Sequence, residues 1–497
     1  MQHFLAEWNT QKEQLEVQLA RQIPEMKLQQ KLQETDWRNL VEKLPEQAVL
    51  VEFVRSRLYD FEGVTAQVES KWKPTHYFAF ILLANKPENV QILDLGEATL
   101  IDRMVASFRA SITGEGSHRE FETVPTEFIA GTVNKGITLR QAIFDPLLKK
   151  ISDRKRLFLA PDGDLSRLPF EVLPIDENRW LIDEYHISYL STGRDVLRFN
   201  AVTSGQSTEP LVLADPDFDL SAKESTTFVN RIKSSGRRSR DLNPSRVYFQ
   251  PLPGTRVEGE KIAEQLGVKK PLLAGKALET SLKACRSPRI LHLATHGFFL
   301  ENQKRDPKVE NLEHFGMTGR LSAHGLENPL LRSGLALAGA NTWLKNGSLP
   351  PEAEDGILTA EDVSGLDLLD TELVVLSACE TGLGEIRTGE GVFGLRRAFI
   401  LAGAKRLIMS LWQVPDKQTQ ELMVDFYTRL LKGQPCADAL REAQLEMKKK
   451  YPNPFYWGAF IFQGDPSALS PLPVGSFHVS SQKMWVRRKD EIQGTTP

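Results

Sequence analysis

Short apolar runs separated by amphipathic stretches set the hydrophobic pattern of this chain from residue 48 onwards. The runs AVLVEFV, HYFAFILLA and VQILDL have the length and composition of strands, and LIDRMVASFRASI after them predicts a helix. TLRQAIFDPLLKKI predicts another helix, which leads into the apolar segments RLFLAPDG and LSRLPFEVLP. This pattern predicts a smaller α/β part over residues 47–207, which ends in the polar link NAVTSGQSTEP.

The pattern then changes to strand-like runs that alternate with helical ones. Helices are predicted around SLKAC and GEGVFGLRRAFILAG, and two more lie between the last two strand-like runs. These strand-like runs are PLVLADPD, RILHLATHG, SGLALAGAN, LVVLSACETG, AKRLIMSLWQVPD and YWGAFIFQGD. Continuous apolar strands separated by helices are typical of a mostly parallel sheet covered on both faces, so residues 208–466 are predicted to form one.

The two ends of the chain differ from this middle. Residues 1–46 have helical periodicity, with Phe4, Trp8, Leu15 and Leu19 on one face and a break at Pro24. This segment either packs against the α/β part or forms an arm that binds a partner. Residues 467–497 have no periodicity and contain Pro, Ser and Gly, so a loose tail is predicted there.

Composition narrows the class of protein. The 497 residues are 41% hydrophobic and 26% charged, with a net charge of -3, which is ordinary for a globular protein and argues against a chain-wide nucleic-acid footprint. We find no apolar window long enough for a membrane helix and no signal-peptide core at the start. Three scattered cysteines suit a reducing compartment, so a cytoplasmic protein is expected.

Two strand ends carry candidate chemistry. ILHLATHG ends in His296 and Gly297, and LVVLSACETG ends in Cys379 followed by Glu380. In an open α/β sheet the loops at the carboxyl ends of parallel strands converge on one crevice. If the two strands are neighbours, an imidazole and a thiol meet there. The imidazole can then activate the thiol as a nucleophile and later protonate a leaving amine.

Other interpretations of the same residues remain open. A cysteine at a strand end is often only a core residue, as we expect for Cys285 and Cys436 in their helical contexts. His292 and His296, spaced HLATH, suggest a metal site, but the glutamate of a zinc-protease helix is missing and the run is strand-like. We therefore predict no metal and no cofactor.

The paired segments LHLATHGFF and VVLSACETGLG resemble the signatures of CHAT domains, which are caspase-like cysteine peptidases related to the separases. The resemblance extends in the family's order from about residue 48 to 466. The further segments that carry it are FLAPDGDLSRLPFEVLP, PLPGTRVEGEKI, SGLALAGAN, EDGILTAEDV, GEGVFGLRRAFILAGAKRLIMSLWQVPD and FYWGAFIFQGD.

This resemblance implies a caspase-like α/β fold, a smaller α/β module before the catalytic one, and a Cys–His dyad. It implies Cys379 as the nucleophile, His296 as the general base, and the backbone N–H groups of Gly297 and Cys379 as oxyanion donors. Bacterial relatives act in regulated proteolysis, including defence systems that release a pore-forming protein. The implied partner is a protein substrate encoded nearby. Many relatives begin with an array of paired helices, so an activating partner at the short N-terminal helices is also expected.

The resemblance also implies where the specificity pocket lies. Caspase-like folds build it from the loops after the first strand and after the strand that follows the nucleophile's helix, here ADPDFD and SLWQVPD. Asp215, Asp217, Trp412 and Asp416 are the candidate pocket residues. The acidic side chains and the absence of arginine from both loops predict cleavage after a basic residue. Alternatively, these aspartates cap helices or form turns.

A basic loop, RIKSSGRRSRDLNPSR at 231–246, is dense in arginine. It is a candidate substrate of the enzyme itself, whose cleavage would uncover the site. It can also be a passive insertion or a nucleic-acid patch, although no aromatic residues are interleaved with the charges. The alternative to an enzyme as a whole is a catalytically silent caspase-fold scaffold that binds a partner, and the presence of both dyad residues favours the enzyme.

Overall fold

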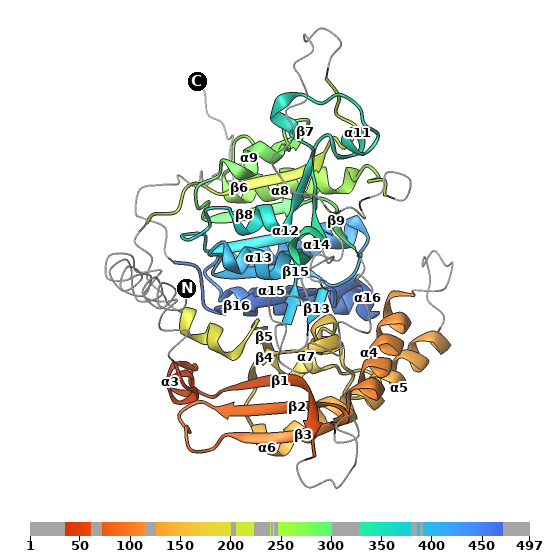
Figure 1. The fold of residues 1–497 in the computed structure, drawn as a ribbon, viewed down its shortest axis with the longest axis vertical. Helices are drawn as coiled ribbons and strands as arrows, with labels where there is room; N and C mark the ends of the chain where they lie inside the picture. Colours follow the sequence, from red (N-terminus) through yellow and green to blue (C-terminus); the bar gives the residue numbers. More distant parts are fainter. Residues whose placement is uncertain are drawn as a thin grey trace, which may run out of the picture.

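The structure is a computed structural model, and it describes residues 35–60, 72–114, 126–199, 205–222, 239, 242, 247–300, 328–378, 385–387 and 391–470 (Figure 1). The predicted helical segment before residue 35, most of the basic loop at 231–246, Cys379 and the tail after residue 470 lie outside these residues. Among the described residues, no helix combines the length and the apolarity needed to cross a membrane.

An 11-stranded sheet runs through the middle of the molecule. In spatial order its strands are β3 (Gln91–Glu97), β2 (Trp72–Leu83), β1 (Ala48–Tyr59), β4 (Arg156–Ala160), β5 (His186–Tyr189), β16 (Phe460–Gly464), β15 (Arg406–Ser410), β12 (Leu373–Ser377), β8 (Ile290–Ala294), β6 (Leu211–Pro216) and β7 (Leu272–Ala274). The predicted fold class, a mixed α/β protein with a large, mostly parallel sheet, is confirmed.

The sheet has two groups of parallel strands. β1, β4 and β5 form the first group, and β15, β12, β8, β6 and β7 form the second. β16 lies between them, antiparallel to β15. It meets β5 through one residue pair, Gln463 with Tyr189. We call the two groups, with the helices around them, the N-terminal part and the C-terminal part, and their boundary between β5 and β16 the seam.

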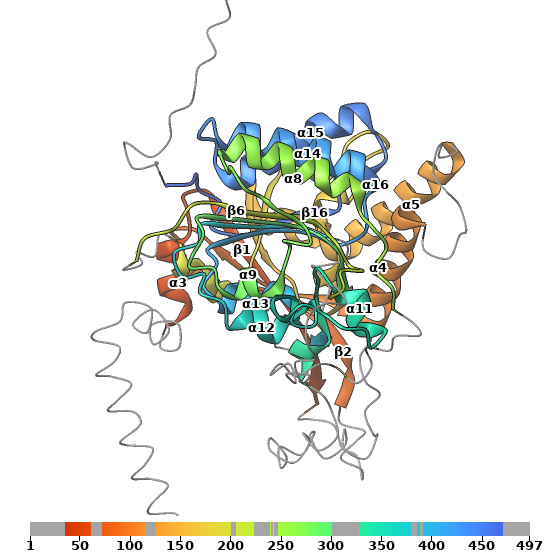
Figure 2. The same cartoon turned by 90° about the horizontal axis from the view of Figure 1, so that it is seen from above.

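Helices cover both faces of the second group of strands (Figure 2). On one face lie α8 (Pro253–Leu266), α14 (Asp416–Leu430) and α15 (Cys436–Lys450). On the other lie α9 (Glu279–Lys283), α12 (Ala360–Ser364) and α13 (Leu395–Leu401). Every residue of β8, β12 and β15 is buried, as the unbroken apolar runs require for strands covered on both sides.

The remaining elements lie in the N-terminal part and in the connections. Their helices are α3 (Trp37–Lys43), α4 (Ala98–Thr113), α5 (Thr126–Ile143), α6 (Asp145–Ile151), α7 (Leu181–Glu184), α11 (Ala340–Leu344) and α16 (Pro454–Trp457). Single 3-10 turns are η2 (Gly163–Arg167), η3 (Phe170–Val172), η4 (Gly193–Arg198), η5 (Pro329–Leu331) and η6 (Pro351–Ala353). Two small antiparallel sheets are formed by β9 (Gly297–Phe299) with β10 (Ser333–Ala336) and β11 (Ile357–Thr359), and by β13 (Glu385–Arg387) with β14 (Gly391–Phe393).

Several elements differ from the sequence expectation. SGLALAGAN forms β10, which pairs in the small sheet with β9 and β11 and not in the large one. GEGVFGLRRAFILAG is not one helix, because Gly391–Phe393 form β14 and α13 begins only after Gly394, whose φ is 159°. TLRQAIFDPLLKKI is divided between α5 and α6 at Phe144, and Pro146 stands in the first turn of α6.

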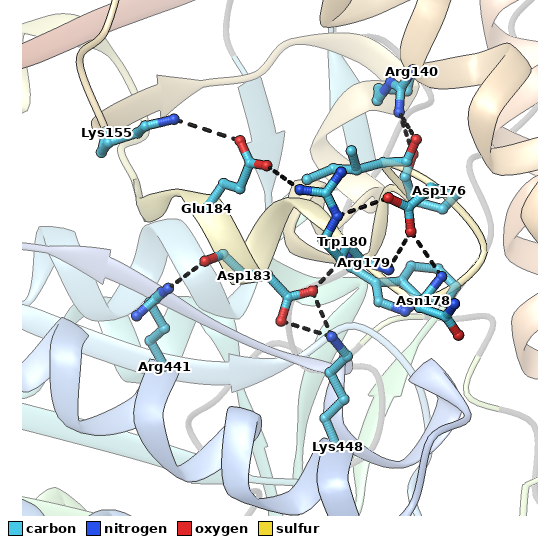
Figure 3. A network of polar contacts seen from close by, with 12 residues as sticks. Arg140, Lys155, Asp176, Asn178, Arg179, Trp180, Asp183, Glu184, Arg441 and Lys448 are labelled. Atoms are coloured by element: carbon cyan, nitrogen blue, oxygen red, sulfur yellow. Dashed lines mark hydrogen bonds and ion pairs between the residues drawn. The ribbon is translucent and has the colours of Figure 1, made fainter.

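Polar contacts fasten the N-terminal part to α15 across the seam (Figure 3). Arg441 donates to the carbonyl oxygens of Ile182, Tyr185 and Asp183 at 2.9, 3.1 and 3.2 Å. Lys448 reaches the Asp183 carboxylate at 2.7 Å. The helix α15 therefore belongs to both parts: one side covers the sheet and the other holds the segment before β5.

Candidate active site

The site predicted from the sequence lies at the carboxyl ends of β6, β8 and β12. These strands are parallel and in register, with Ala294 opposite both Ala214 and Ser377. His296 follows Ala294 by two residues, and Cys379 follows Ser377 by two residues. Because parallel strands in register present their carboxyl ends at one edge, the last residues of β8 and β12 lie side by side, two positions before His296 and Cys379 in the sequence.

His296 is held by a backbone carbonyl. Its Nε2 lies 2.8 Å from the carbonyl oxygen of Gln250, in the segment that leads into α8. A carbonyl can only accept a hydrogen bond, so Nε2 must carry the proton, and Nδ1 is left as the basic nitrogen of the neutral ring. The contact therefore fixes both the tautomer and the orientation of the imidazole.

Aromatic rings surround this histidine. The centroids of Phe218 and Phe249 lie 5.3 and 5.8 Å from that of His296. Burial in this setting lowers the pKa of His296 below its usual 6.5, while the Gln250 carbonyl and the nearby Asp416 carboxylate act in the opposite direction. The ring is thus neutral, and able to accept a proton, over a wider pH range than an exposed histidine.

Cys379 lies outside the described residues, and Ala378, the residue before it, is the last described residue after β12. The two other cysteines are described, and both are poor nucleophiles. Burial raises the pKa of Cys285 to about 11 and that of Cys436 to about 12. Neither thiol forms an appreciable thiolate near neutral pH, in keeping with the packing role expected for both.

Gly297, the candidate oxyanion donor, is the first residue of β9 and pairs with Leu335 of β10. The carbonyl of the residue before it, His296, accepts from the Ala336 N–H at 2.9 Å. The backbone beside the histidine is therefore fixed by the small sheet. The roles of Gly297 and Cys379 as oxyanion donors remain predictions.

The four candidate pocket residues occupy different surroundings. Asp215 adopts a left-handed φ of 47° and its carboxylate binds Arg256 Nε at 2.9 Å. Asp217 is exposed, and its backbone carbonyl accepts from Leu220 and Gly339. The charge of Asp215 is thus already paired, whereas that of Asp217 faces solvent.

The two candidates after β15 are more enclosed. Trp412 is only 2% exposed, and its indole donates to the Phe455 carbonyl at 3.0 Å, so it packs into the core. Asp416, at the first position of α14, is half-buried against Gly254, where a Cβ would lie 2.2 Å from its own Cβ. Burial raises the pKa of Asp416, the Gly254 N–H opposes that effect, and the Glu258 charge adds to it.

Comparisons with known proteins identify the family to which this chain belongs. The CHAT domain model matches residues 134–465. The chain belongs to the CHAT domain family. The resemblance inferred from the sequence is thereby confirmed.

The curated relatives are much longer than this chain. The human tetratricopeptide repeat protein 28 is 26% identical over 325 residues, and the mouse protein 30% identical over 326 residues. Each match covers 64% of this chain and 12% of the relative, so the chain spans about an eighth of those proteins' length.

Two solved structures are also similar. The Saccharomyces cerevisiae separase–securin complex is 9% identical, with a TM-score of 0.46, and the match covers 90% of this chain and 31% of that one. The Arg-specific cysteine proteinase gingipain R is 10% identical, with a TM-score of 0.32, and the match covers 74% of each chain.

Two groups beside the site of this CHAT domain could not be predicted from the sequence. The Gln250 carbonyl leaves no trace in a sequence, because every residue has one. Arg256, the partner of Asp215, lies in the quoted segment PLPGTRVEGEKI, but its distance of 41 residues from Asp215 hid the pairing. Only the fold brings the first turn of α8 beside the end of β6.

Proposed function

We propose that this CHAT protein is a cysteine endopeptidase in which Cys379 is the nucleophile and His296 the general base. The observation that carries the proposal is the register of β8 and β12 together with the bond from His296 to Gln250. The register sets the last residues of β8 and β12 side by side, two positions before His296 and Cys379, and the bond to Nε2 leaves Nδ1 as the basic nitrogen that would take the thiol proton.

The chemistry follows from that arrangement. His296 Nδ1 takes the thiol proton, and the thiolate attacks the peptide carbonyl to give a tetrahedral oxyanion, which the N–H groups of Gly297 and Cys379 stabilise. The C–N bond then breaks, and the imidazolium gives its proton to the leaving amine. Water activated by Nδ1 hydrolyses the thioester and regenerates the thiol. The Gln250 carbonyl stabilises the imidazolium through Nε2–H in each half of the cycle.

The dyad is tested by Cys379→Ala and His296→Ala in purified full-length protein. Each should lower turnover of a cleaved peptide by roughly 10³-fold or more, and the double variant should lose little beyond either single one, because the two groups act as a unit. Cys285→Ala is the matched control and should retain activity. A folded Cys379→Ala protein with substantial peptidase activity would exclude the assignment.

A test that needs no substrate uses iodoacetamide. The rate of Cys379 alkylation against pH reports its thiolate fraction, since the thiolate is the reactive form. We expect reaction well below the ordinary thiol pKa of about 8.5 in the wild type, and an ordinary profile in His296→Ala. Cys285 and Cys436, followed by mass spectrometry in the same sample, should remain unreacted at neutral pH.

We further propose cleavage after a basic residue, through Asp416 and Asp217. Asp215 contributes less than the sequence suggested, because Arg256 already neutralises it. A peptide library should show a preference for Arg or Lys that weakens in Asp416→Asn. A preference for Asp at that position would overturn the idea. If Arg256→Ala strengthens the basic preference, the freed Asp215 carboxylate belongs to the pocket as well.

The biological setting we propose is regulated bacterial proteolysis of a specific protein partner, for example one that forms pores, with an activator at the N-terminal helices. Both ideas rest on the family resemblance. Incubating wild-type and Cys379→Ala protein with the products of neighbouring genes, and mapping the fragments, tests them. A cut within the chain's own 231–246 loop, in the wild type only, would support self-processing. Stable binding of an uncleaved partner would favour the scaffold alternative.

A further inference from the structure

A buried polar group lies directly behind the candidate active site. His292 of β8 is 0% exposed and stands beside Glu258 of α8, which is 1% exposed, with 3.1 Å between Nε2 and Oε1. The other ring nitrogen, Nδ1, lies 3.1 Å from the hydroxyl of Tyr427 on α14. One imidazole therefore contacts both helices that cover this face of the sheet. It is also the first histidine of HLATH, to which the peptidase mechanism assigns no role.

The starts of both helices lie close to His296. The segment that precedes α8 carries Gln250, whose carbonyl holds His296, and α14 begins with Asp416. The two helix starts touch where Gly254 packs against Asp416. Any rotation or slide of α8 on β8 would therefore move the Gln250 carbonyl relative to the histidine ring.

The charge of Glu258 also acts on Asp416, one of the candidate site residues. The carboxylates of Glu258 and Asp416 interact unfavourably, and the negative charge of Glu258 contributes to the raised pKa of Asp416. An isolated carboxylate as deeply buried as Glu258 is costly, so it needs a donor or a positive partner. His292 Nε2 lies 3.1 Å from Glu258 Oε1, close enough for a protonated imidazole to act as the positive partner, although the contact does not have hydrogen-bond geometry. On the remaining sides, its strand neighbours are Val375 and Val212, which offer no charge.

We propose that Glu258 and His292 form a positioning pair that anchors α8 on β8 and thereby sets the tautomer and orientation of His296 through Gln250. The pair does not touch the substrate. This inference rests on the proposed peptidase function for its catalytic consequence, but its structural claim concerns the His296 ring and can be measured without any activity.

The test compares Glu258→Gln, His292→Gln and Tyr427→Phe in full-length protein that also carries Cys379→Ala. Nitrogen-15 spectra of labelled histidine rings distinguish protonation at Nε2 from protonation at Nδ1. In the protein that carries Cys379→Ala alone, His296 should have the Nε2–H tautomer. Glu258→Gln and His292→Gln should each produce a mixture of tautomers. The smaller change, Tyr427→Phe, preserves the volume of the ring and provides a folded variant if the others unfold.

Glu279→Gln is the matched control. Glu279 is also a buried carboxylate, 0% exposed and paired with Lys283 at 2.7 Å, but α9 lies on the opposite face of the sheet (Figure 2). It should lose stability and leave the His296 spectrum unchanged. An unchanged His296 spectrum in folded Glu258→Gln, His292→Gln and Tyr427→Phe proteins would overturn the inference.

Alkylation of Cys379 in the same variants, now with the cysteine restored, connects the pair to function. The rate at neutral pH should fall roughly tenfold in Glu258→Gln and in His292→Gln, and no further in the double variant, because both act through one contact. If the wild-type cysteine has an ordinary thiol profile, the proposed peptidase function fails, while the ring spectra still decide the positioning claim.

Discussion

The two groups of parallel strands end in different chemistry. In the N-terminal part, β4 is followed by Asp162, which accepts from the N–H groups of Arg55 at 2.9 Å and Gly163 at 2.8 Å. Asp195 likewise accepts from the N–H of Ser191, just after β5, at 2.9 Å. These carboxylates accept hydrogen bonds from backbone N–H groups, within turns and, for Asp162, from β1. In the C-terminal part, β8 is followed by His296, whose Nε2 is held by the Gln250 carbonyl, while Nδ1 has no hydrogen bond to any of the described residues.

Buried carboxyl groups show the same contrast. Glu171 of the N-terminal part accepts from the Tyr189 hydroxyl at 2.7 Å, and burial raises its pKa to about 7. Glu258 of the C-terminal part has a histidine beside it instead. A phenol can donate a hydrogen bond but does not take a positive charge, whereas an imidazole can do both. Both parts have parallel strands covered by helices, and they differ in the group that stands beside the buried carboxyl group: a tyrosine in the N-terminal part and a histidine in the C-terminal part.

The substitution Arg109→Ala is expected to have the largest effect on stability and activity, because Arg109 joins the two parts. It lies on α4, is 5% exposed, and donates to the carbonyls of Arg167 and Leu411, the latter at 3.2 Å. Leu411 directly follows β15 and leads to Asp416. Arg109→Ala should cost about 3 kcal/mol of unfolding free energy, because two carbonyls lose a charged donor. It should also lower kcat/KM about tenfold as the loop after β15 shifts.

Arg140→Ala is the control for that change. Arg140 also donates to two carbonyls, those of Pro174 and Ile175, both at 2.7 Å, but all its partners belong to the N-terminal part. It should cost similar stability in urea unfolding and leave kcat/KM per folded molecule unchanged. Equal losses of activity in the two variants would mean that the N-terminal part affects the site only through overall stability.

The sequence predicted the parts of the fold that depend on local pattern. The runs that became β8, β12 and β15 are apolar throughout because both faces are covered, and strand ends of such runs located His296. The pattern could not assign SGLALAGAN to the correct sheet, because buried strands of the large and small sheets are equally apolar. It also gave no sign of the single pair at the seam, Gln463 with Tyr189, which depends on contacts between residues far apart in the chain.

Contacts between residues far apart in the sequence also determine which site residues could be predicted. His296 stands out by residue type and position, whereas Gln250 acts through its backbone and Glu258 reaches His292 across 34 residues of sequence. Trp412 was assigned to the pocket from its place in a loop, but a large aromatic side chain with an indole partner is better suited to the core, where the structure has it.

A smaller, pH-dependent effect is expected from Glu171→Gln. The pKa of Glu171 is about 7 in the folded protein against an ordinary 4.5, so between these values the folded state binds more protons than the unfolded state. Stability contributed by this group is therefore present below pH 4.5 and is lost as the pH rises toward 7. The glutamine variant, whose amide oxygen still accepts from Tyr189, should gain on the wild type by about 2 kcal/mol across that window.

Urea unfolding at several pH values measures this difference, and only its change with pH matters, since other groups titrate in both proteins. A constant offset between wild type and Glu171→Gln from pH 4.5 to 7 would show that Glu171 titrates in the folded state as it does in water.

The smallest effect concerns the ion pair of Lys448 and Asp183 at the seam (Figure 3). The two side chains are 17% and 24% exposed, so solvent screens their attraction. Lys448→Met keeps the aliphatic stem and should cost only about 0.5 kcal/mol. Asp183→Ala should cost more, about 1–2 kcal/mol, because this carboxylate also accepts from the Trp180 N–H at 2.7 Å and stabilises the start of α7.

Neither change should affect kcat/KM, since neither side chain contacts the loops after β8 or β15. The double variant should match Asp183→Ala alone, and a Lys448→Met cost as large as that of Asp183→Ala would show that the pair is a principal link between the two parts.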